Sequence, residues 1–185
     1  MHSAARTPSE SPDFATVLHE LHARARIHDA ILRFARGIDR CDRQLALSAF
    51  HADAAADYGS FAGNREEVVD WVIAQHREVT LTSHYISNEY VEIDGDTANA
   101  ETYVQAIHRF ERDGDLFELA GGGRYLDRFD LRDGDWRIAH RLVVIDRDRI
   151  DRVAETNQTD LTQKLRFGTR GPDDPGYDYV RRVPE

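Results

Sequence analysis

The chain has little cysteine and no long hydrophobic run. Cys41 is the only cysteine among 185 residues, which excludes an internal disulfide and a multi-cysteine zinc site. No apolar segment approaches the roughly 20 residues that a membrane-spanning helix needs, and the first residues lack the apolar region of a secretion signal. We therefore expect a cytoplasmic protein with no membrane partner.

The chain has no excess of positive charge: 34 Asp and Glu residues outnumber 24 Lys and Arg residues, and the net charge is -10 at pH 7. A nucleic-acid-binding protein needs a basic face to meet phosphates, so we expect no nucleic-acid partner. The pattern of histidines does not indicate a metal site within one predicted helix. His19 and His22 are three residues apart, but they lie among polar residues in the first turns of a helix. We predict neither a metal nor another cofactor.

The length and composition indicate one folded domain with two tails. Residues 1–12 are rich in Ser, Pro and Ala, which predicts a disordered leader. Residues 13–150 carry the periodic hydrophobic patterns of a folded domain. Residues 151–185 are polar and contain several Pro and Gly residues, so we interpret them as an extended arm that packs on a partner subunit.

The first part of the domain has a helical period and the second part a strand period. Apolar residues at steps of three and four predict three helices, at 13–38, 43–50 and 65–79, with a short strand at 54–58 between the last two. Two-residue alternation then predicts four long strands, at 83–93, 97–110, 116–131 and 136–146.

Each break between the four long strands contains Asp-Gly, a strong hairpin signal, so the strands should form an antiparallel meander. The simplest way to bury both apolar surfaces is a curved antiparallel sheet that wraps around the N-terminal helices as a half-open cone. The sequence therefore predicts an α+β cone with an inner cavity that suits a small molecule. Gly121, Gly122 and Gly123 lie inside a strand pattern, which favours a bulge or bend over a phosphate loop.

Two polar residues stand in apolar surroundings at element ends. Asp39 lies where the first predicted helix ends, and His84 lies near the start of the first long strand. A carboxylate beside an imidazole fixes the tautomer of the ring and stabilises its protonated form, so the ring can accept a proton near neutral pH. If the fold brings the two together in a pocket, they form an acid/base pair.

Several short motifs, in this order and spacing, resemble the SnoaL-like branch of the nuclear transport factor 2-like superfamily, which has an α+β cone fold. The resemblance covers about residues 18–146. Its motifs lie at residues 36–40, 53–59, 84–88, 95–103, 122–125 and 133–138. Within the superfamily the chain looks like the group that includes scytalone dehydratase, hexachlorocyclohexane dehydrochlorinase and bile-acid 7α-dehydratase, which are cofactor-free lyases.

The resemblance implies that His84 removes a proton from the substrate while Asp39 orients and stabilises the ring. Several relatives place a Tyr about five residues before the Asp, whereas this chain has Phe34 there. A substrate hydroxyl would then need another proton donor. Tyr58 is the candidate for that role, and Tyr103 is the reserve.

Further residues have the positions expected of substrate contacts. Strand alternation places Asn88 on the face of His84, although Asn88 could also be an ordinary polar residue near a strand edge. Arg124 could stabilise negative charge in the cavity or pair across strands. His108 has the spacing of a pocket residue, although its pattern favours a solvated or packed role. Phe34 is expected beside Asp39. For Arg141 we favour a structural role, either cross-strand pairing with Asp127, Glu118 or Glu101 or a place in a dimer interface.

The sequence thus predicts a cofactor-independent dehydratase-type lyase that acts on a hydrophobic aromatic or steroid-like small molecule, as a homodimer or homotrimer. The alternatives are an isomerase or polyketide cyclase, a lyase releasing chloride or formaldehyde, a non-catalytic binding or scaffold domain, and the small subunit of a ring-hydroxylating dioxygenase.

Overall fold

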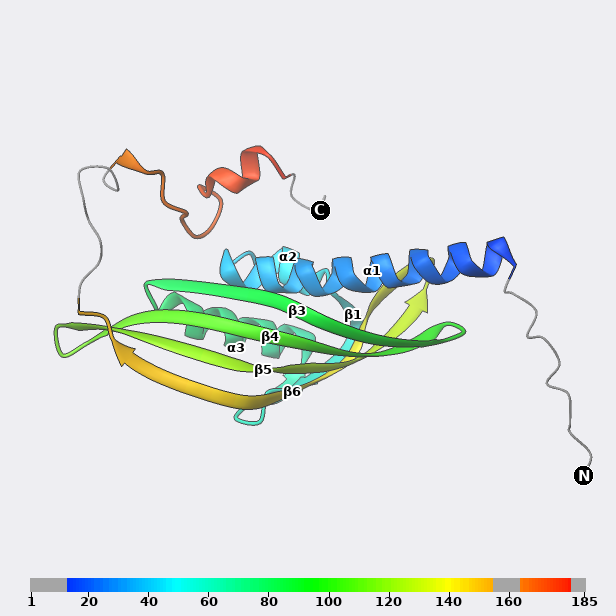
Figure 1. The fold of residues 1–185 in the computed structure, drawn as a ribbon, viewed down its shortest axis with the longest axis horizontal. Coiled ribbons are helices and arrows are strands. Elements are labelled where there is room, and N and C mark those ends of the chain that lie inside the picture. The colour runs from blue at the N-terminus through cyan, green and yellow to red at the C-terminus, as the bar shows by residue number, and fades with distance from the viewer. Residues whose placement is uncertain (1–12, 155–163, 181–185) are drawn as a thin grey trace, which may run out of the picture.

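A computed structural model describes residues 13–154 and 164–180 of the chain, so the predicted leader at 1–12 lies outside the described residues. Helices dominate the first part and long strands the second, as predicted (Figure 1). In chain order the elements are α1 Phe14–Asp39, α2 Arg43–Leu47, β1 Phe50–Asp57, β2 Ala62–Asn64, α3 Arg65–Arg77, β3 Leu81–Asp94, β4 Thr97–Arg112, β5 Asp115–Arg132, β6 Asp135–Arg152 and the 3-10 turn η2 Pro175–Asp178.

The six strands form one curved, open sheet in the order β2-β1-β6-β5-β4-β3. Strands β3 to β6 are consecutive antiparallel neighbours, which confirms the predicted meander. Strand β1, however, pairs in parallel with β6, so the sheet is mixed and the expectation of a purely antiparallel sheet is wrong for this pair. The difference arises because no tight turn joins β1 to β6, whereas each meander pair is joined by a hairpin that dictates antiparallel pairing.

The Asp-Gly signals mark the hairpin turns correctly. Asp113 and Gly114 have φ angles of 55° and 84°, and Asp133 and Gly134 have 54° and 79°. Two consecutive residues with positive φ form the turn whose twist matches that of the flanking strands, and Asp and Gly tolerate this backbone better than most residues. The turns therefore set the register of the long strands from local sequence alone.

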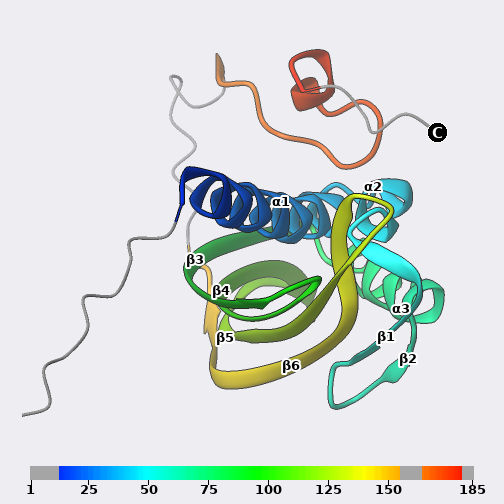
Figure 2. The same cartoon turned by 90° about the vertical axis from the view of Figure 1, so that its right-hand side faces the viewer.

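The sheet curls around the helices, so that α1 and α2 cross its open side and α3 closes another side (Figure 2). Strand β5 changes register against β6 between Gly122 and Gly123, which confirms the expected bulge. A Cβ atom at Gly123 would lie 2.2 Å from the carbonyl oxygen of Val144. Only glycine therefore allows β5 and β6 to approach this closely at the bend.

Capping residues fix where the helices begin. The Asp13 side chain accepts a hydrogen bond of 2.9 Å from the Thr16 backbone N–H at the start of α1. At the start of α3, Asn64 and Glu67 form a reciprocal capping box. Both sites satisfy N–H groups that the helix itself leaves without partners.

Some predicted element ends are wrong by several residues. Helix α2 ends at Leu47, because Phe50 already pairs with Ile138 in the sheet as part of β1. Strand β6 continues to Arg152, beyond the predicted end at 146, since pairing with β5 extends the ladder past the last alternating residues. The three residues of β2 were not predicted, because they are too few to show a period.

One half of the cone, the filled half, is solid beneath the body of α1. Several of its large apolar side chains are at most 1% exposed: Phe34, Phe50, Phe129, Trp136 and Ile138. The ring of Phe34 meets the rings of Phe50 and Tyr125 edge-on, at centroid distances of 5.5 and 6.0 Å. Burying several aromatic side chains together is a large share of the hydrophobic stabilisation.

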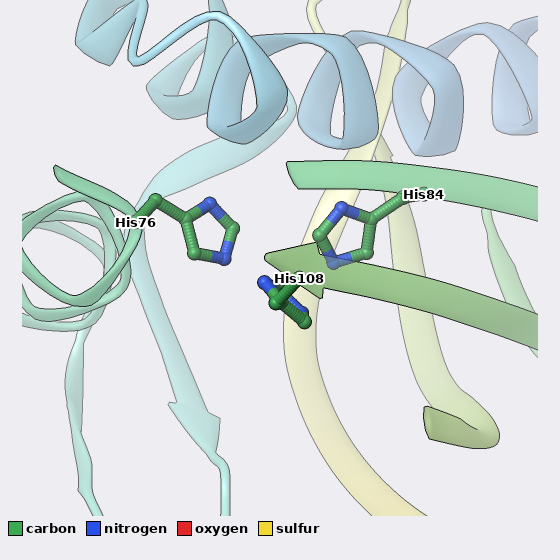
Figure 3. Close-up of side chains that lie close together, drawn as sticks. All are labelled: His76, His84 and His108. Carbon is green, nitrogen blue, oxygen red and sulfur yellow. The ribbon is translucent and has the colours of Figure 1, made fainter. Parts of the chain in front are cut away.

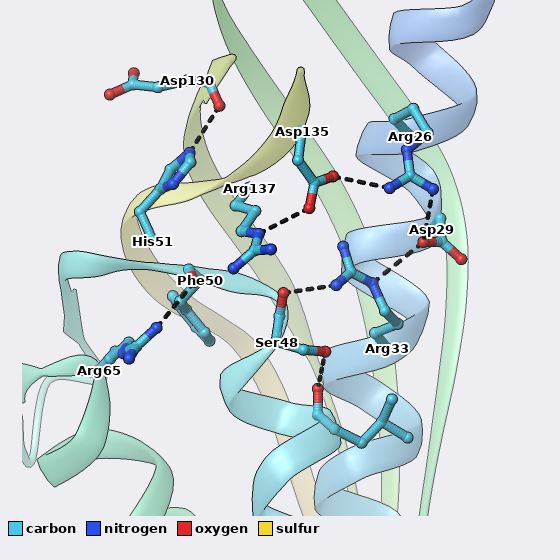
Figure 4. A network of polar contacts seen from close by, with 11 residues as sticks. Arg26, Asp29, Arg33, Ser48, Phe50, His51, Arg65, Asp130, Asp135 and Arg137 are labelled. Atoms are coloured by element: carbon cyan, nitrogen blue, oxygen red, sulfur yellow. Dashed lines mark hydrogen bonds and ion pairs between the residues drawn. The ribbon is translucent and has the colours of Figure 1, made fainter. Parts of the chain in front are cut away.

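A polar network ties α1 to the following elements beside this filled half (Figure 4). Arg33 donates a hydrogen bond of 2.6 Å to the Ser48 carbonyl oxygen, which joins α1 to the end of α2. Arg26 pairs with Asp135 at 2.8 Å, and Arg137 donates to the same carboxylate at 2.8 Å. These bonds hold the helix against the start of β6.

The described part of the predicted arm at 151–185 folds onto its own chain. Residues 164–180 lie beside the ends of helices α1 and α3 (Figures 1 and 2). The polar contacts join Gly171 N–H to the Arg40 carbonyl, the Tyr177 hydroxyl to the Asp42 carboxylate and the Arg170 guanidinium to the His76 carbonyl. Packing of the arm on a partner subunit stays a prediction.

Among the described residues, none of the helices combines the length and apolar composition that a membrane crossing requires.

Candidate functional site

The other half of the cone, the hollow half, contains a cavity of about 460 Å³. The cavity lies between α3, the last turn of α1 and strands β4 to β6. Small residues on the sheet leave the space open, namely Ala106 and Gly121 to Gly123. The other lining residues are mostly apolar or aromatic and include Ile38, Trp71, Val104, Phe110 and Leu119. A space of this size and character suits one small hydrophobic ligand.

His84 and Asp39 meet at the wall of this cavity. The Nδ1 atom of His84 lies 2.7 Å from Asp39 Oδ1. The His84 backbone N–H donates to Asp39 Oδ2 at 2.9 Å, and the Thr82 hydroxyl donates to Oδ1 at 3.2 Å. The first residues of strand β3 therefore hold the Asp39 carboxylate at the end of α1 with three hydrogen bonds. Because Nδ1 faces Asp39, the other ring nitrogen of His84, Nε2, does not bind the carboxylate.

The charge state of Asp39 follows from these contacts. Burial alone would raise its pKa, but the hydrogen bonds and positive charge of His84 outweigh burial and leave the pKa below its ordinary value of 3.8. Asp39 is therefore a carboxylate at neutral pH, and it accepts the N–H of the ring. This arrangement fixes the tautomer of His84 and can stabilise an imidazolium.

Two more histidines stand beside His84 (Figure 3). The ring centroid of His84 lies 5.4 Å from that of His76 on α3 and 5.6 Å from that of His108 on β4. His108 and His76 are 5.2 Å apart. Burial lowers the pKa of both His76 and His108 to about 4, and each is lowered further by the charge of neighbouring histidines. Both rings are therefore neutral at pH 7.

His76 was missed by the sequence analysis. It lies on helix α3, on the same buried side as Val69, Val72 and Ile73. A histidine that continues an apolar helical stripe is a signal that could have pointed to it. The signal is weak because the residues that complete the cluster come from other elements.

Tyr58 lines the same cavity, and its hydroxyl is buried without a hydrogen-bond partner among the described residues. Burial raises the pKa of Tyr58 to about 12, although the positive charge of Arg141 acts in the opposite direction. The hydroxyl therefore keeps its proton at neutral pH and can donate it to a ligand.

Arg141 lies in the filled half, with its guanidinium 4.5 Å from the ring centroid of Phe34. Its guanidinium donates two hydrogen bonds of 2.7 Å to Asp127 on the neighbouring strand, and neither side chain is exposed. This is one of the cross-strand partners that the sequence analysis offered. The charge of Asp127 keeps the pKa of Arg141 above its ordinary value despite burial. The guanidinium also lies 3.9 Å from the ring centroid of Tyr125, which lines the cavity.

Two residues expected near the substrate lie elsewhere. Phe34 is fully buried in the filled half and is absent from the cavity lining. Asn88 is exposed and is also absent from the lining. Asn88 does not share the face of His84, because β3 shifts register against β4 between Ile86 and Glu89.

Tyr103 and Arg124 are cross-strand neighbours on β4 and β5. Tyr103 is 42% exposed and lies outside the cavity lining, so its expected reserve role as a proton donor lacks the required position. Arg124 contributes to the lining, but its guanidinium binds Asp146 and Glu101. The alternative of cross-strand pairing therefore describes Arg124 better than binding of an anionic substrate oxygen.

The family follows from both the fold and the sequence. A family model for the SnoaL-like domain matches residues 19–142, and the chain belongs to this family, as the motifs indicated. No curated protein matches the chain in sequence.

Solved structures share the cone fold at low sequence identity. A hexachlorocyclohexane dehydrochlorinase, LinA-type3 from Novosphingobium barchaimii, is 19% identical with a TM-score of 0.62, covering 77% of this chain and 98% of that one. A Novosphingobium aromaticivorans protein provisionally named a scytalone dehydratase is 22% identical with a TM-score of 0.61, covering 74% and 91%. Rv3472 of Mycobacterium tuberculosis, of unknown function, is 26% identical with a TM-score of 0.60, covering 71% and 76%.

Proposed function

We propose that this protein is a cofactor-independent lyase that eliminates water from a hydrophobic aromatic or steroid-like compound. The observation that carries the proposal is the 2.7 Å contact between His84 Nδ1 and Asp39 at the wall of an apolar cavity. The names of two solved relatives, a dehydrochlorinase and a provisional dehydratase, refer to elimination reactions and support the same class.

In the proposed reaction the Nε2 atom of His84 removes a proton from a carbon or oxygen next to an activating group of the substrate. Asp39 keeps the ring oriented and stabilises the imidazolium that forms. Thr82 and the His84 backbone N–H hold the carboxylate in place, so the pair does not need to reorganise during the reaction.

The leaving hydroxyl needs a proton when the carbon–oxygen bond breaks. Tyr58 is the proposed donor, because its buried hydroxyl lines the cavity and its pKa of about 12 keeps it protonated. Transfer of that proton releases water, and the proton on His84 returns through solvent to restore Tyr58. General acid/base catalysis of this kind contributes about 10² to 10⁴-fold to the rate.

The decisive experiment is a thermal-shift screen of phenolic, lignin-derived and steroid alcohols, followed by mass spectrometry of any compound that binds. We expect a compound that stabilises the protein and loses water on turnover in the presence of a chelator. His84→Ala should lower the rate by about 10² to 10⁴-fold, and Asp39→Asn should lower it as well. The matched control is His140→Ala, which changes an exposed histidine of β6.

Other results of this experiment would favour a different function for the protein. A product of unchanged mass would favour the isomerase or polyketide cyclase, and release of chloride or formaldehyde would identify another lyase. Equal turnover in His84→Ala and wild type would contradict the proposed mechanism. Binding without any turnover would favour a scaffold domain, and copurification with an iron-bearing subunit would favour the dioxygenase small subunit.

We also propose that the protein acts in the cytoplasm as a homodimer or homotrimer. Sedimentation velocity of the full chain measures the mass of the assembly directly, and a monomer would contradict this part of the proposal.

A further inference from the structure

We propose that His76, His84 and His108 bind one divalent transition-metal ion, with an open coordination position facing the cavity. The three rings come from α3, β3 and β4 and converge on a common space (Figure 3). One nitrogen atom from each ring lies within 4.8 Å of one nitrogen atom from each of the others. The proposal goes beyond the proposed lyase activity and does not require the protein to be an enzyme.

The hydrogen bonds of two rings direct the correct nitrogen atoms toward the space. His76 Nδ1 lies 3.0 Å from the Ile38 carbonyl oxygen, which can only accept, so this nitrogen carries the proton. His84 Nδ1 donates in the same way to the Asp39 carboxylate. In both rings the lone pair is then on Nε2. Metal-binding histidines typically donate their second N–H to a carbonyl or a carboxylate, which orients the ring and increases its basicity.

The third ring is free to complete the set. Neither ring nitrogen of His108 forms a hydrogen bond to another residue in the described part of the chain, and the side chain lines the cavity. A metal needs imidazoles in the neutral form, which burial favours over the charged form. The cluster therefore offers three neutral nitrogen ligands, from elements that the fold holds side by side.

The dimensions require a small contraction on binding. A tetrahedral zinc ion has Zn–N bonds of about 2.0 to 2.1 Å, which places its nitrogen ligands roughly 3.4 Å apart. Rotation of the rings about their side-chain bonds can close the difference from 4.8 Å, because the space between the rings is part of the cavity. Three imidazoles and an open position suit zinc, copper, nickel or iron rather than magnesium or calcium, which prefer oxygen ligands.

The same atom, His84 Nε2, is both the proposed metal ligand and the proposed proton acceptor of the lyase reaction. Metal occupancy and proton abstraction by His84 are therefore mutually exclusive in one molecule. If both proposals hold, zinc should inhibit the turnover of chelator-treated protein. The two proposals are tested separately, because metal binding is measured without substrate and lyase turnover is measured with chelator.

The experiment is a titration of chelator-treated, untagged full-length protein with Co²⁺ and with Zn²⁺. We expect one equivalent of Co²⁺ per chain and the visible absorption of a four- or five-coordinate ion, displaced by Zn²⁺. Asp39→Asn should weaken binding by about 10 to 100-fold, since it alters a partner of a ligand. His76→Ala and His108→Ala remove direct ligands and should weaken binding by more.

The matched control is His22→Ala, which removes one member of the exposed His19 and His22 pair on α1 and should leave the tight site intact. His76→Gln provides a second variant if His76→Ala does not fold, as judged by circular dichroism. The proposal is overturned if wild type binds no stoichiometric Co²⁺, or if the folded His76 and His108 variants bind it as tightly as wild type. Loss of binding in His22→Ala alone would assign the metal to the surface pair.

Discussion

The filled and hollow halves of the cone each contain a buried carboxylate with a basic partner, but the two pairs have different surroundings. In the filled half, Asp127 and Arg141 are wholly shielded, and aromatic rings lie against the guanidinium. In the hollow half, Asp39 and His84 have side chains 11% and 7% exposed, and the histidine lines the cavity. The basic partner in the filled half cannot lose its charge near neutral pH, whereas imidazole can change charge there.

This difference separates a structural ion pair from a chemical one. A buried pair with no route to solvent or ligand can only hold its strands together. A pair with one free ring nitrogen beside a cavity can exchange a proton or bind an ion. Each prediction below tests whether the two halves of the cone differ in this way.

The largest expected effect is in the filled half. Asp127→Ala leaves the Arg141 charge buried without its partner, so the free energy of unfolding should fall by about 3 to 5 kcal/mol. Urea denaturation followed by circular dichroism measures this loss. As a control, Asp146→Ala removes an exposed partner of Arg124 and should have a much smaller effect. Equal losses in the two variants would show that burial does not distinguish them.

The next effect is at the bend of β5, on the border of the cavity. Gly123→Ala places a Cβ against the Val144 carbonyl, so the backbone must shift, at a cost of about 1 to 3 kcal/mol. Gly121→Ala is the matched control, because its Cβ would meet nothing within 4 Å. Denaturation midpoints should therefore fall for Gly123→Ala and stay near wild type for Gly121→Ala. The reverse order would contradict the described register.

A smaller effect concerns pH and the hollow half. The pKa of His76 is about 4 in the folded protein and about 6.5 in the unfolded chain, so between these values the unfolded chain binds more protons. Stability should therefore fall as the pH falls from 6.5 toward 4. For His76 alone the loss is about 2 kcal/mol at pH 5 relative to neutral pH.

Urea denaturation at several pH values in chelator measures this slope for wild type, His76→Gln and the exposed control His22→Gln. The slope should flatten in His76→Gln and persist in the control. An unchanged slope in His76→Gln would mean that the ring is already protonated or accessible to water in the folded state.

The smallest effect is expected at the partly exposed ion pairs of Arg124. Arg124→Gln breaks ion pairs with Asp146 and Glu101 that are open to solvent and screened by salt. We expect little change in the denaturation midpoint and little change in turnover. A large loss of turnover alone would restore Arg124 as a substrate-binding residue.

Local patterns were sufficient to predict most of the fold. The helical period of α1 and the Asp-Gly turns depend only on residues that are close together in the sequence. Both could therefore be predicted from the sequence. The parallel pairing of β1 with β6 could not be predicted in this way, because most of the folded chain lies between these two strands in the sequence. The shift after Ile86 that exposes Asn88 is likewise a property of two paired strands rather than of one.

The residues of the candidate site also differ in whether the sequence alone could predict them. Asp39 and His84 could be proposed from the sequence because each is a polar residue at the end of an apolar element and matches a family motif. His76 could not, since its importance comes from rings on β3 and β4 that lie beside it. Phe34 and Tyr103 lie outside the cavity lining, because the curvature and register of the sheet decide which side chains reach the cavity.

The amino-acid sequence by itself determined the helices, the hairpin turns and the presence of an acid and an imidazole at two element ends, because short-range sterics, capping and periodicity are encoded in neighbouring residues. Only the tertiary structure decided that three imidazoles face one cavity while Arg141 is enclosed with Asp127. That outcome depends on the curvature and register of the whole sheet, which are set by the packing of distant segments against one another.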